Sequence, residues 1–286
     1  MKFSNVTLTP LLLFAGMLVV VLAVVLAIKI RRIMTSNDPL AFERQRLSLI
    51  PENRDYILGY LKVARRFRIS GTLVGLLIGI IASEAGPSGA VLLSTNWFFT
   101  SIAGYFVGAL VGAWKSGMSS TGTERTASLT VRSRNDFVSE WFIKATYIAA
   151  GGSVAFFAAS LFERSGTATE GVGVRWLVMA SALTVAAVTD LGTRRLVQAS
   201  RPSANEDVMS AFNAITRASS SAVATAGLSL SLWLLSCSAL SARPTTGQSF
   251  FSIVCILVGI AMLFASGTVW FAARRGEWRQ ELALRA

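Results

Sequence analysis

The stretch ISGTLVGLLIGIIASEAGPSGAVLLSTNWFFTSIAGYFVGALVGAW, residues 69–114, contains one charged side chain, Glu84, and one run of turn-forming residues, GPSG at 86–89. A helix needs about 20 mainly apolar residues to cross the hydrocarbon core of a bilayer. Each side of the turn supplies roughly that length. Because Gly and Pro mark turns, the stretch predicts two transmembrane helices joined as a hairpin.

Five further apolar stretches extend this pattern over the chain. Apolar residues make up 53% of the sequence and charged residues 15%, and the mean hydropathy is +0.57, which is typical of a membrane protein. We expect an all-α integral membrane protein that forms a single membrane domain over residues 1–286. Its seven predicted spans are 10–28, 69–86, 91–114, 145–162, 174–192, 220–240 and 249–272.

The N-terminal apolar run is interpreted as a retained span. It is uncharged from Phe3 to Ile28, 26 residues, whereas the apolar part of a cleaved signal peptide is shorter. It also ends in the cations Lys29, Arg31 and Arg32, which favour a stop-transfer segment.

Basic residues orient the spans. Alternate connecting segments hold 23 of the 27 Lys and Arg residues, and only Lys2, Arg164, Arg175 and Arg243 lie in the others. Cations beside spans mark the cytoplasmic side, so we expect the N-terminus outside and the C-terminus inside a bacterial cytoplasmic membrane. This topology also accounts for the net charge of +12 without a nucleic-acid partner.

A weak internal repeat divides the chain. An offset of 152 places Asp55 on Asp207, Tyr60 on Phe212 and Gly75 on Gly227. It predicts two parallel three-helix units, 1–114 and 174–286, separated by a cytoplasmic loop and linker span at 115–173. The alternative is that any multi-pass protein places basic loops before apolar spans. In favour of the repeat, 14 of the 23 predicted inside cations lie in the related segments 29–68 and 194–217.

The loop before the second span predicts a short amphipathic helix on the inner membrane surface. Between Asp55 and Phe67, apolar residues recur at helical spacing and cations occupy other positions. Three roles remain open for these cations: binding of anionic headgroups, docking of a protein partner, and orientation of the chain. The candidate contact residues are Arg54, Lys62, Arg65, Arg66, Arg68 and, in the second copy, Arg217.

Glycines predict how two of the spans pack. One recurs at every fourth residue in each of the two hairpin helices, which removes side chains from one face. Close backbone approach drives helix association in lipid, where the hydrophobic effect gives no such drive. We therefore expect tight packing through Gly71, Gly75, Gly79, Gly104, Gly108 and Gly112. The alternative is a smooth face that lines a path.

Residue types that carry enzyme chemistry are missing. The chain has no histidine, no phosphate-binding Gly-Lys-Ser/Thr loop and no Gly-x-Ser-x-Gly elbow, so we expect no catalytic residue, cofactor or metal. Asp190 precedes Arg194 by four residues, a spacing that predicts an ion pair on a helix. Cys237 and Cys255 are interpreted either as two buried small side chains or as a disulfide.

The duplicated loop carries a resemblance. Its order of an Arg-Arg-Leu element, a Pro, an Asp and a basic helix, over 44–80 and more faintly 194–231, resembles multi-pass membrane proteins of actinobacteria, and this resemblance implies no activity. The three-plus-one-plus-three order also looks like that of SWEET sugar transporters, but their paired Pro-Gln motif is absent here. We expect a non-enzymatic membrane subunit or accessory protein with a partner at its basic face; the alternative is a permease for an unidentified solute.

Overall fold

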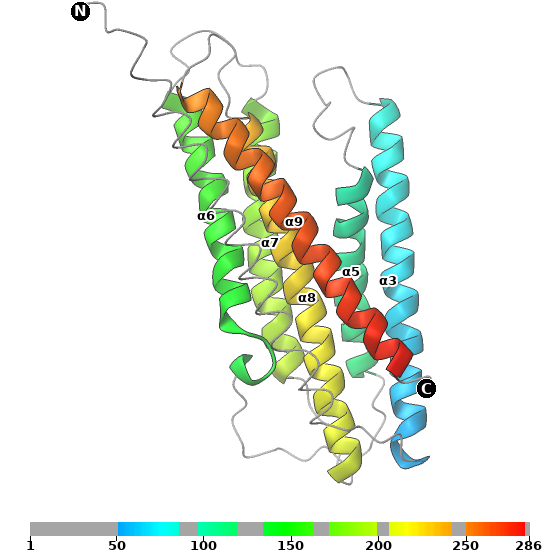
Figure 1. The fold of residues 1–286 in the computed structure, drawn as a ribbon. Coiled ribbons are helices and arrows are strands. Elements are labelled where there is room, and N and C mark those ends of the chain that lie inside the picture. Colours follow the sequence, from blue (N-terminus) through cyan, green and yellow to red (C-terminus); the bar gives the residue numbers. More distant parts are fainter. Residues whose placement is uncertain are drawn as a thin grey trace, which may run out of the picture. The chain divides into compact units, whose positions relative to one another are not determined.

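The computed structural model describes residues 51–85, 97–118, 134–162, 172–198, 206–241 and 250–283. These residues are helical throughout apart from short turns, and no strand occurs among them (Figure 1). The elements are α3 (Pro51–Ala85), α5 (Trp97–Met118), the 3-10 turn η1 (Arg134–Asp136), α6 (Glu140–Phe162), α7 (Val172–Gln198), α8 (Glu206–Ser241) and α9 (Phe250–Ala283).

Five of the described helices are long and apolar enough to cross a membrane, so the chain is a multi-pass membrane protein by length and composition. The five segments are Trp97–Lys115, Glu140–Leu161, Arg175–Gln198, Ile215–Ser241 and Ser252–Phe271. They match the third to seventh predicted spans. The first predicted span, 10–28, lies outside the described residues, and the second, 69–86, falls in α3, which is not among the five.

The predicted short surface helix does not exist as a separate element. Residues 55–67 form the first part of α3, a single helix of 35 residues. A helix lying on the membrane and a helix crossing it need a sharp bend between them, and such bends occur at Pro, at Gly or Ser pairs, or at bulges. Ser70 and Gly71 form such a pair, but Gly71 packs against the backbone of α5 at Gly104, and the helix continues through it. In the same way α8 runs through 36 residues without a break.

Large apolar side chains lie on the outside of several helices. Ile148 in α6 is 74% exposed and Phe264 in α9 is 70% exposed, as expected for surfaces that face lipid tails. α8 is the opposite case, because 94% of the residues in its apolar stretch are buried. Its buried side chains include many small ones, such as Ala224, Ser229 and Ala239, and small side chains let neighbouring helices approach closely in lipid.

Hydroxyl groups in the spans mostly bond to their own helices. The hydroxyl of Ser153 donates to the carbonyl of Ala149 at 3.2 Å, and that of Thr184 donates to Ala180 at 2.8 Å. Ser and Thr side chains that bond in this way are satisfied without a ligand.

The chain divides into two compact units. Among the described residues, unit 1 comprises 146–162, 172–184, 231–241 and 250–283, and unit 2 comprises 51–85, 97–118, 134–145, 185–198 and 206–230. Helices α6, α7 and α8 each contribute to both. The division into 1–114, 115–173 and 174–286 remains a prediction.

In unit 1, α8 packs against α9 at a glycine. Ser236 donates a hydrogen bond to the carbonyl of Gly259 at 2.7 Å, and a Cβ added at Gly259 would lie 2.6 Å from Cγ of Leu240. Cys237 and Cys255 are both buried, and no disulfide joins them in this structure. Of the two interpretations of these cysteines, the structure therefore has the pair of small buried side chains.

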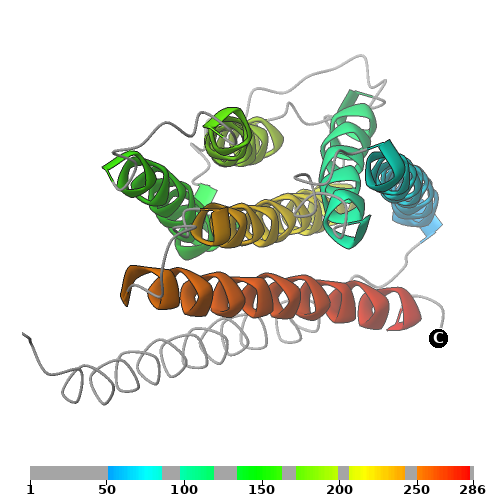
Figure 2. The same cartoon turned by 90° about the horizontal axis from the view of Figure 1, so that it is seen from above.

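In unit 2, α3 and α5 lie side by side (Figures 1 and 2). A Cβ added at Gly71 would overlap the carbonyl oxygen of Gly104, and one added at Gly104 would overlap that of Gly71. The same holds for Gly75 against the carbonyl of Thr100. The two backbones are therefore in direct contact, and no side chain fits between them.

Charged side chains extend this contact toward one end of the helix pair. The guanidinium of Arg68 lies 5.8 Å from the ring centre of Tyr105, and the ammonium of Lys115 lies 5.3 Å from that of Phe67. Cation–π pairs at such distances contribute about 0.5–1 kcal/mol where solvent reaches them.

The backbone contact gives a direct test. We expect Gly71→Ala to lower the free energy of unfolding by about 1–3 kcal/mol, since the new methyl group forces α3 away from the rigid carbonyl of Gly104. The matched control is Gly59→Ala on the same helix, where an added Cβ meets nothing within 4 Å and alanine favours the helix. Thermal unfolding of the purified protein in detergent measures both, and equal melting temperatures would contradict the packing argument.

Candidate functional site

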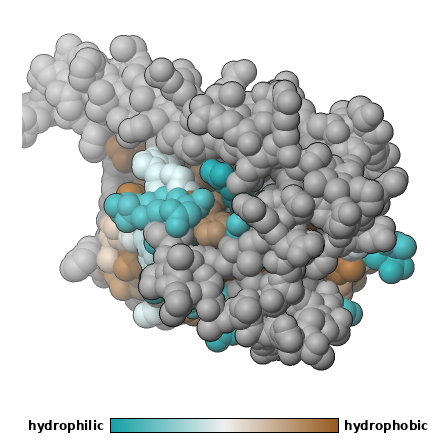
Figure 3. Space-filling model, turned by 90° about the horizontal axis from the view of Figure 1, so that it is seen from below, coloured by the Kyte–Doolittle hydropathy of each residue, from teal (hydrophilic) through white to brown (hydrophobic). Residues whose placement is uncertain are grey.

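Cations gather at one end of the unit 2 helices, which we call the basic end: the starts of α3, α6 and α8 and the ends of α5 and α7. Figure 3 views the molecule from below, with hydrophilic side chains in teal beside apolar ones in brown. Within unit 2, ten basic and three acidic side chains are described, the acidic ones being Asp136, Glu140 and Asp190. The ten are Lys62, Arg65, Arg66, Arg68, Lys115, Arg134, Lys144, Arg194, Arg195 and Arg217. Four more acidic residues, Glu52, Asp55, Glu206 and Asp207, lie near the starts of α3 and α8, and their side chains are outside the description.

The predicted contact residues divide into two kinds. Lys62, Arg65 and Arg66 are exposed along α3, as a contact surface requires. Arg68 is half-buried against Tyr105, and Arg217 is half-buried in α8. Arg54 belongs to α3, but its side chain lies outside the description. The exposed group on α3 is therefore the part best placed to meet a partner.

The six predicted packing glycines lie together between α3 and α5. Gly108 faces the carbonyl of Phe67, Gly79 faces Trp97 and Thr100, and a Cβ at Gly112 would lie 3.1 Å from Cβ of Phe67. Their contacts are mainly with backbone, which leaves no space for a ligand along this face. They are therefore assigned to helix packing.

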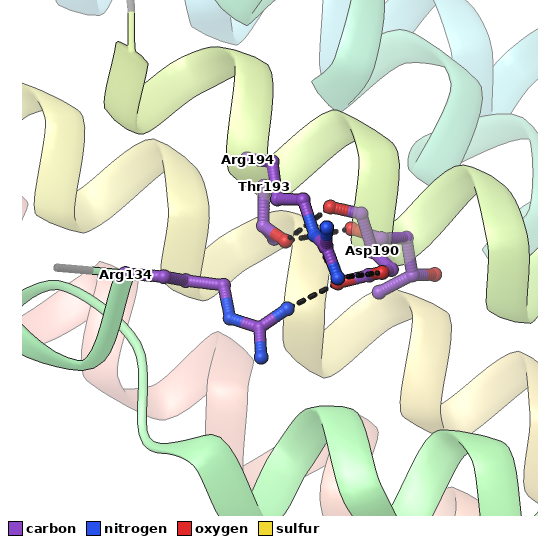
Figure 4. Close-up of polar contacts among 5 residues, drawn as sticks. Arg134, Asp190, Thr193 and Arg194 are labelled. Atoms are coloured by element: carbon purple, nitrogen blue, oxygen red, sulfur yellow. Dashed lines mark hydrogen bonds and ion pairs between the residues drawn. The ribbon is translucent and has the colours of Figure 1, made fainter.

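Asp190 forms the most buried charged site at the basic end. Its carboxylate, with the residue only 6% exposed, accepts bonds from Arg194 of the same helix: Nη2 lies 2.9 Å from Oδ2 and Nε lies 3.1 Å from Oδ1. This is the expected pair four residues apart. Arg134 adds a second guanidinium, which donates from Nη1 to Oδ1 (Figure 4).

The segment around η1 holds Arg134 in place. The backbone N–H groups of Phe137 and Val138 both donate to the carbonyl of Arg134, each at 3.0 Å. Helix α6 then begins at Glu140, and the N–H of Phe142 donates to the carbonyl of Ser139 at 3.0 Å. Asn135 lies in the 3-10 turn, five residues before the start of α6.

Packing of α7 against α8 fixes the position of Asp190. A Cβ added at Gly227 of α8 would overlap the hydroxyl of Thr189 and lie 2.8 Å from its Cγ2. On the same helix, Thr193 donates to the carbonyls of Thr189 and Asp190, both at 2.9 Å. The glycine thus lets α7 come close enough to α8 to bury the residue next to the carboxylate.

Sequence reasoning found one of the two partners of Asp190. Arg194 follows from helical spacing, but Arg134 is 56 residues away, and no spacing rule links them. The only signal was that the middle loop contains arginines as well as carboxylates.

No metal centre occurs in the described part of the chain, since no group of three or more His, Cys, Asp or Glu side chains comes together there. The arrangement at the basic end is instead one of ion pairs and exposed cations. Its exposed cations can attract negative charge.

No protein-family model, no curated protein and no solved structure matches the chain. Its function is therefore inferred from the geometry of its own residues.

Neutralising the buried carboxylate tests the site. We expect Asp190→Asn to lower the free energy of unfolding by about 2 kcal/mol, because two guanidinium groups lose their shared counter-charge. This loss is smaller than that expected for a fully buried ion pair, since the Arg194 side chain is exposed. The control is Glu140→Gln, which breaks an exposed pair with Lys144 at 3.1 Å and should cost less than about 0.5 kcal/mol. If thermal unfolding shows the same loss for both variants, the Asp190 cluster does not stabilise the fold.

Proposed function

We propose that the protein is a non-enzymatic multi-pass protein of a bacterial cytoplasmic membrane, which works as a subunit or accessory protein with a partner at its basic end. The observation that supports this is the exposed cations Lys62, Arg65 and Arg66 on α3. They stand on a helix that packs against α5 mainly through glycines. Such a surface suits a partner with acidic side chains or anionic lipid at the membrane.

The proposed topology has seven spans, with the N-terminus outside and the basic end in the cytoplasm. It is supported by the gathering of unit 2 cations at one end of antiparallel helices, since basic residues beside spans stay on the cytoplasmic side. α3 then counts as a span together with the five apolar helices and the segment 10–28.

We propose that the two halves of the chain repeat the same order of helices, although the helices of the two halves pack differently. α3 and α8 have nearly equal lengths of 35 and 36 residues, which supports common ancestry of the two halves. Their contacts differ, however. Gly104 faces Gly71 and Gly75 near the middle of α3, whereas Gly259, which matches Gly104 at a slightly larger offset of 155, faces Leu240 near the end of α8.

A permease is the second candidate, and one observation favours it. The hydroxyls of Ser220 and Ser231 are buried in α8 and have no hydrogen-bond partner among the described residues. Unsatisfied hydroxyls within a span are expected where polar solutes pass.

The topology is tested by reporters fused after Ser88 and Ser120. We expect a reporter that is active only outside the cytoplasm to work after Ser88 and to stay silent after Ser120. The opposite pattern would reverse the orientation.

The partner is tested by purification in mild detergent followed by mass spectrometry. We expect a protein that copurifies with the wild type to be lost from the charge-reversal variant Lys62→Glu/Arg66→Glu, because the reversed charges repel an acidic surface. The control Lys62→Arg/Arg66→Lys keeps both charges and should retain it. Equal recovery with both variants would rule out the α3 cations as the docking surface.

Transport is tested with the purified protein alone in liposomes that contain a mixture of sugars, amino acids and inorganic phosphate. We expect no release above that of protein-free liposomes. Release that falls in Ser220→Ala or Ser231→Ala would instead favour the permease.

A further inference from the structure

The Asp190 cluster carries more positive than negative charge. Two guanidinium groups, those of Arg134 and Arg194, share one carboxylate. The neighbouring described carboxylates do not correct this balance. Glu140 is paired with Lys144 at 3.1 Å, and Asp136 is exposed, so water screens its charge.

Both guanidinium groups keep unused donors. An arginine side chain has five N–H donors. Arg134 directs Nη1 to Asp190, and Arg194 directs Nε and Nη2 to it. Within the described parts of the chain, neither side chain has another hydrogen bond or ion pair.

Solvent reaches the two groups to different degrees. The Arg134 side chain is 22% exposed and that of Arg194 is 56% exposed, whereas that of Asp190 is 8% exposed. A small anion can therefore approach the guanidinium groups from outside while the carboxylate stays covered. The exposed Arg195 adds a further cation beside Arg194.

The location of the cluster indicates the kind of anion. Asp190 and Arg194 lie in the second half of the apolar segment Arg175–Gln198, with Arg194 four residues before its end. This places the guanidinium groups near the depth of lipid headgroups. Basic sites between transmembrane helices on the cytoplasmic side bind anionic headgroups, and the planar fork of arginine matches two oxygens of a phosphate.

We propose that Arg134 and Arg194, which converge on Asp190, form a binding site for a phosphate group, supplied either by an anionic lipid headgroup or by a soluble phosphate. The bound phosphate neutralises the surplus cation and accepts the unused N–H donors. Since the site sits at the basic end, the proposal rests on the membrane placement given under the proposed function, but it requires no protein partner.

The test uses the purified full-length protein in nanodiscs of phosphatidylcholine, with or without phosphatidylglycerol, and in phosphatidylcholine nanodiscs with inorganic phosphate. Bound lipid is counted by native mass spectrometry, and the melting temperature is measured in each case. We expect phosphatidylglycerol to bind and to raise the melting temperature of the wild type. A rise with inorganic phosphate alone would assign the same site to a soluble phosphate.

Removal of the guanidinium groups should abolish the effect. We expect Arg134→Gln/Arg194→Gln to weaken anion binding about tenfold or more, which corresponds to the loss of at least one charge-assisted hydrogen bond. Lys144→Gln is the matched control, since it removes a cation of the basic end whose side chain is 64% exposed and should leave binding within about twofold of the wild type. If the double variant does not fold, Arg194→Gln alone serves, because that side chain is largely exposed.

Unchanged anion binding in the arginine variants, or equal losses in these variants and Lys144→Gln, would overturn the site. Neither result depends on recovery of a protein partner. Failure of the partner experiment with retained phosphatidylglycerol binding would leave the site in place and refute the docking role.

Discussion

Helix association in lipid is the constraint on which this fold depends. Lipid tails are as apolar as Leu or Ile, so burying large apolar side chains between helices gains little, and contact depends on how closely backbones approach. Glycine gives the closest approach. In α3 and α5 the glycines bring carbonyl groups against the opposite backbone, as at Gly71 and Gly104. The large side chains that a soluble protein would bury, such as Ile81, are left outside, where that residue is 65% exposed.

The same constraint positions the charged site. Gly227 in α8 accommodates Thr189 of α7, which brings two helix backbones together one residue before Asp190. The carboxylate is then too buried to be hydrated by water. An unpaired charge in such a place costs several kcal/mol. Arg194 satisfies it from within the helix, and Arg134 satisfies it from the segment before α6. A small residue in one helix thus leads to an ion pair that ties a loop to another helix.

Local patterns in the sequence predicted what local forces determine. The apolar stretches predicted the third to seventh spans, and for most ends of these spans the predicted and observed positions differ by only a few residues. The four-residue spacing predicted the Asp190–Arg194 pair. Three features depended on tertiary contacts and were missed. The basic segment 55–67 continues into the rest of α3 through the Ser70–Gly71 pair, where Gly71 packs against the backbone of α5. The burial of α8 depends on which helices surround it, and its composition alone resembles that of other spans. Arg134 reaches Asp190 only once the chain has folded.

Asp190 does not need Arg134 for the neutralisation of its charge. Arg194 already engages both oxygens of Asp190, so a neutral pair exists without Arg134. Adding a guanidinium whose side chain is only 22% exposed incurs a further loss of hydration, and one carboxylate does not compensate two cations. In water such a surplus is screened within about 10 Å, but near the hydrocarbon region screening is weaker, and an anion that arrives at the site gains correspondingly more. A cluster that is poorly balanced by itself and well balanced with a bound phosphate is better explained as a binding site than as a structural ion pair.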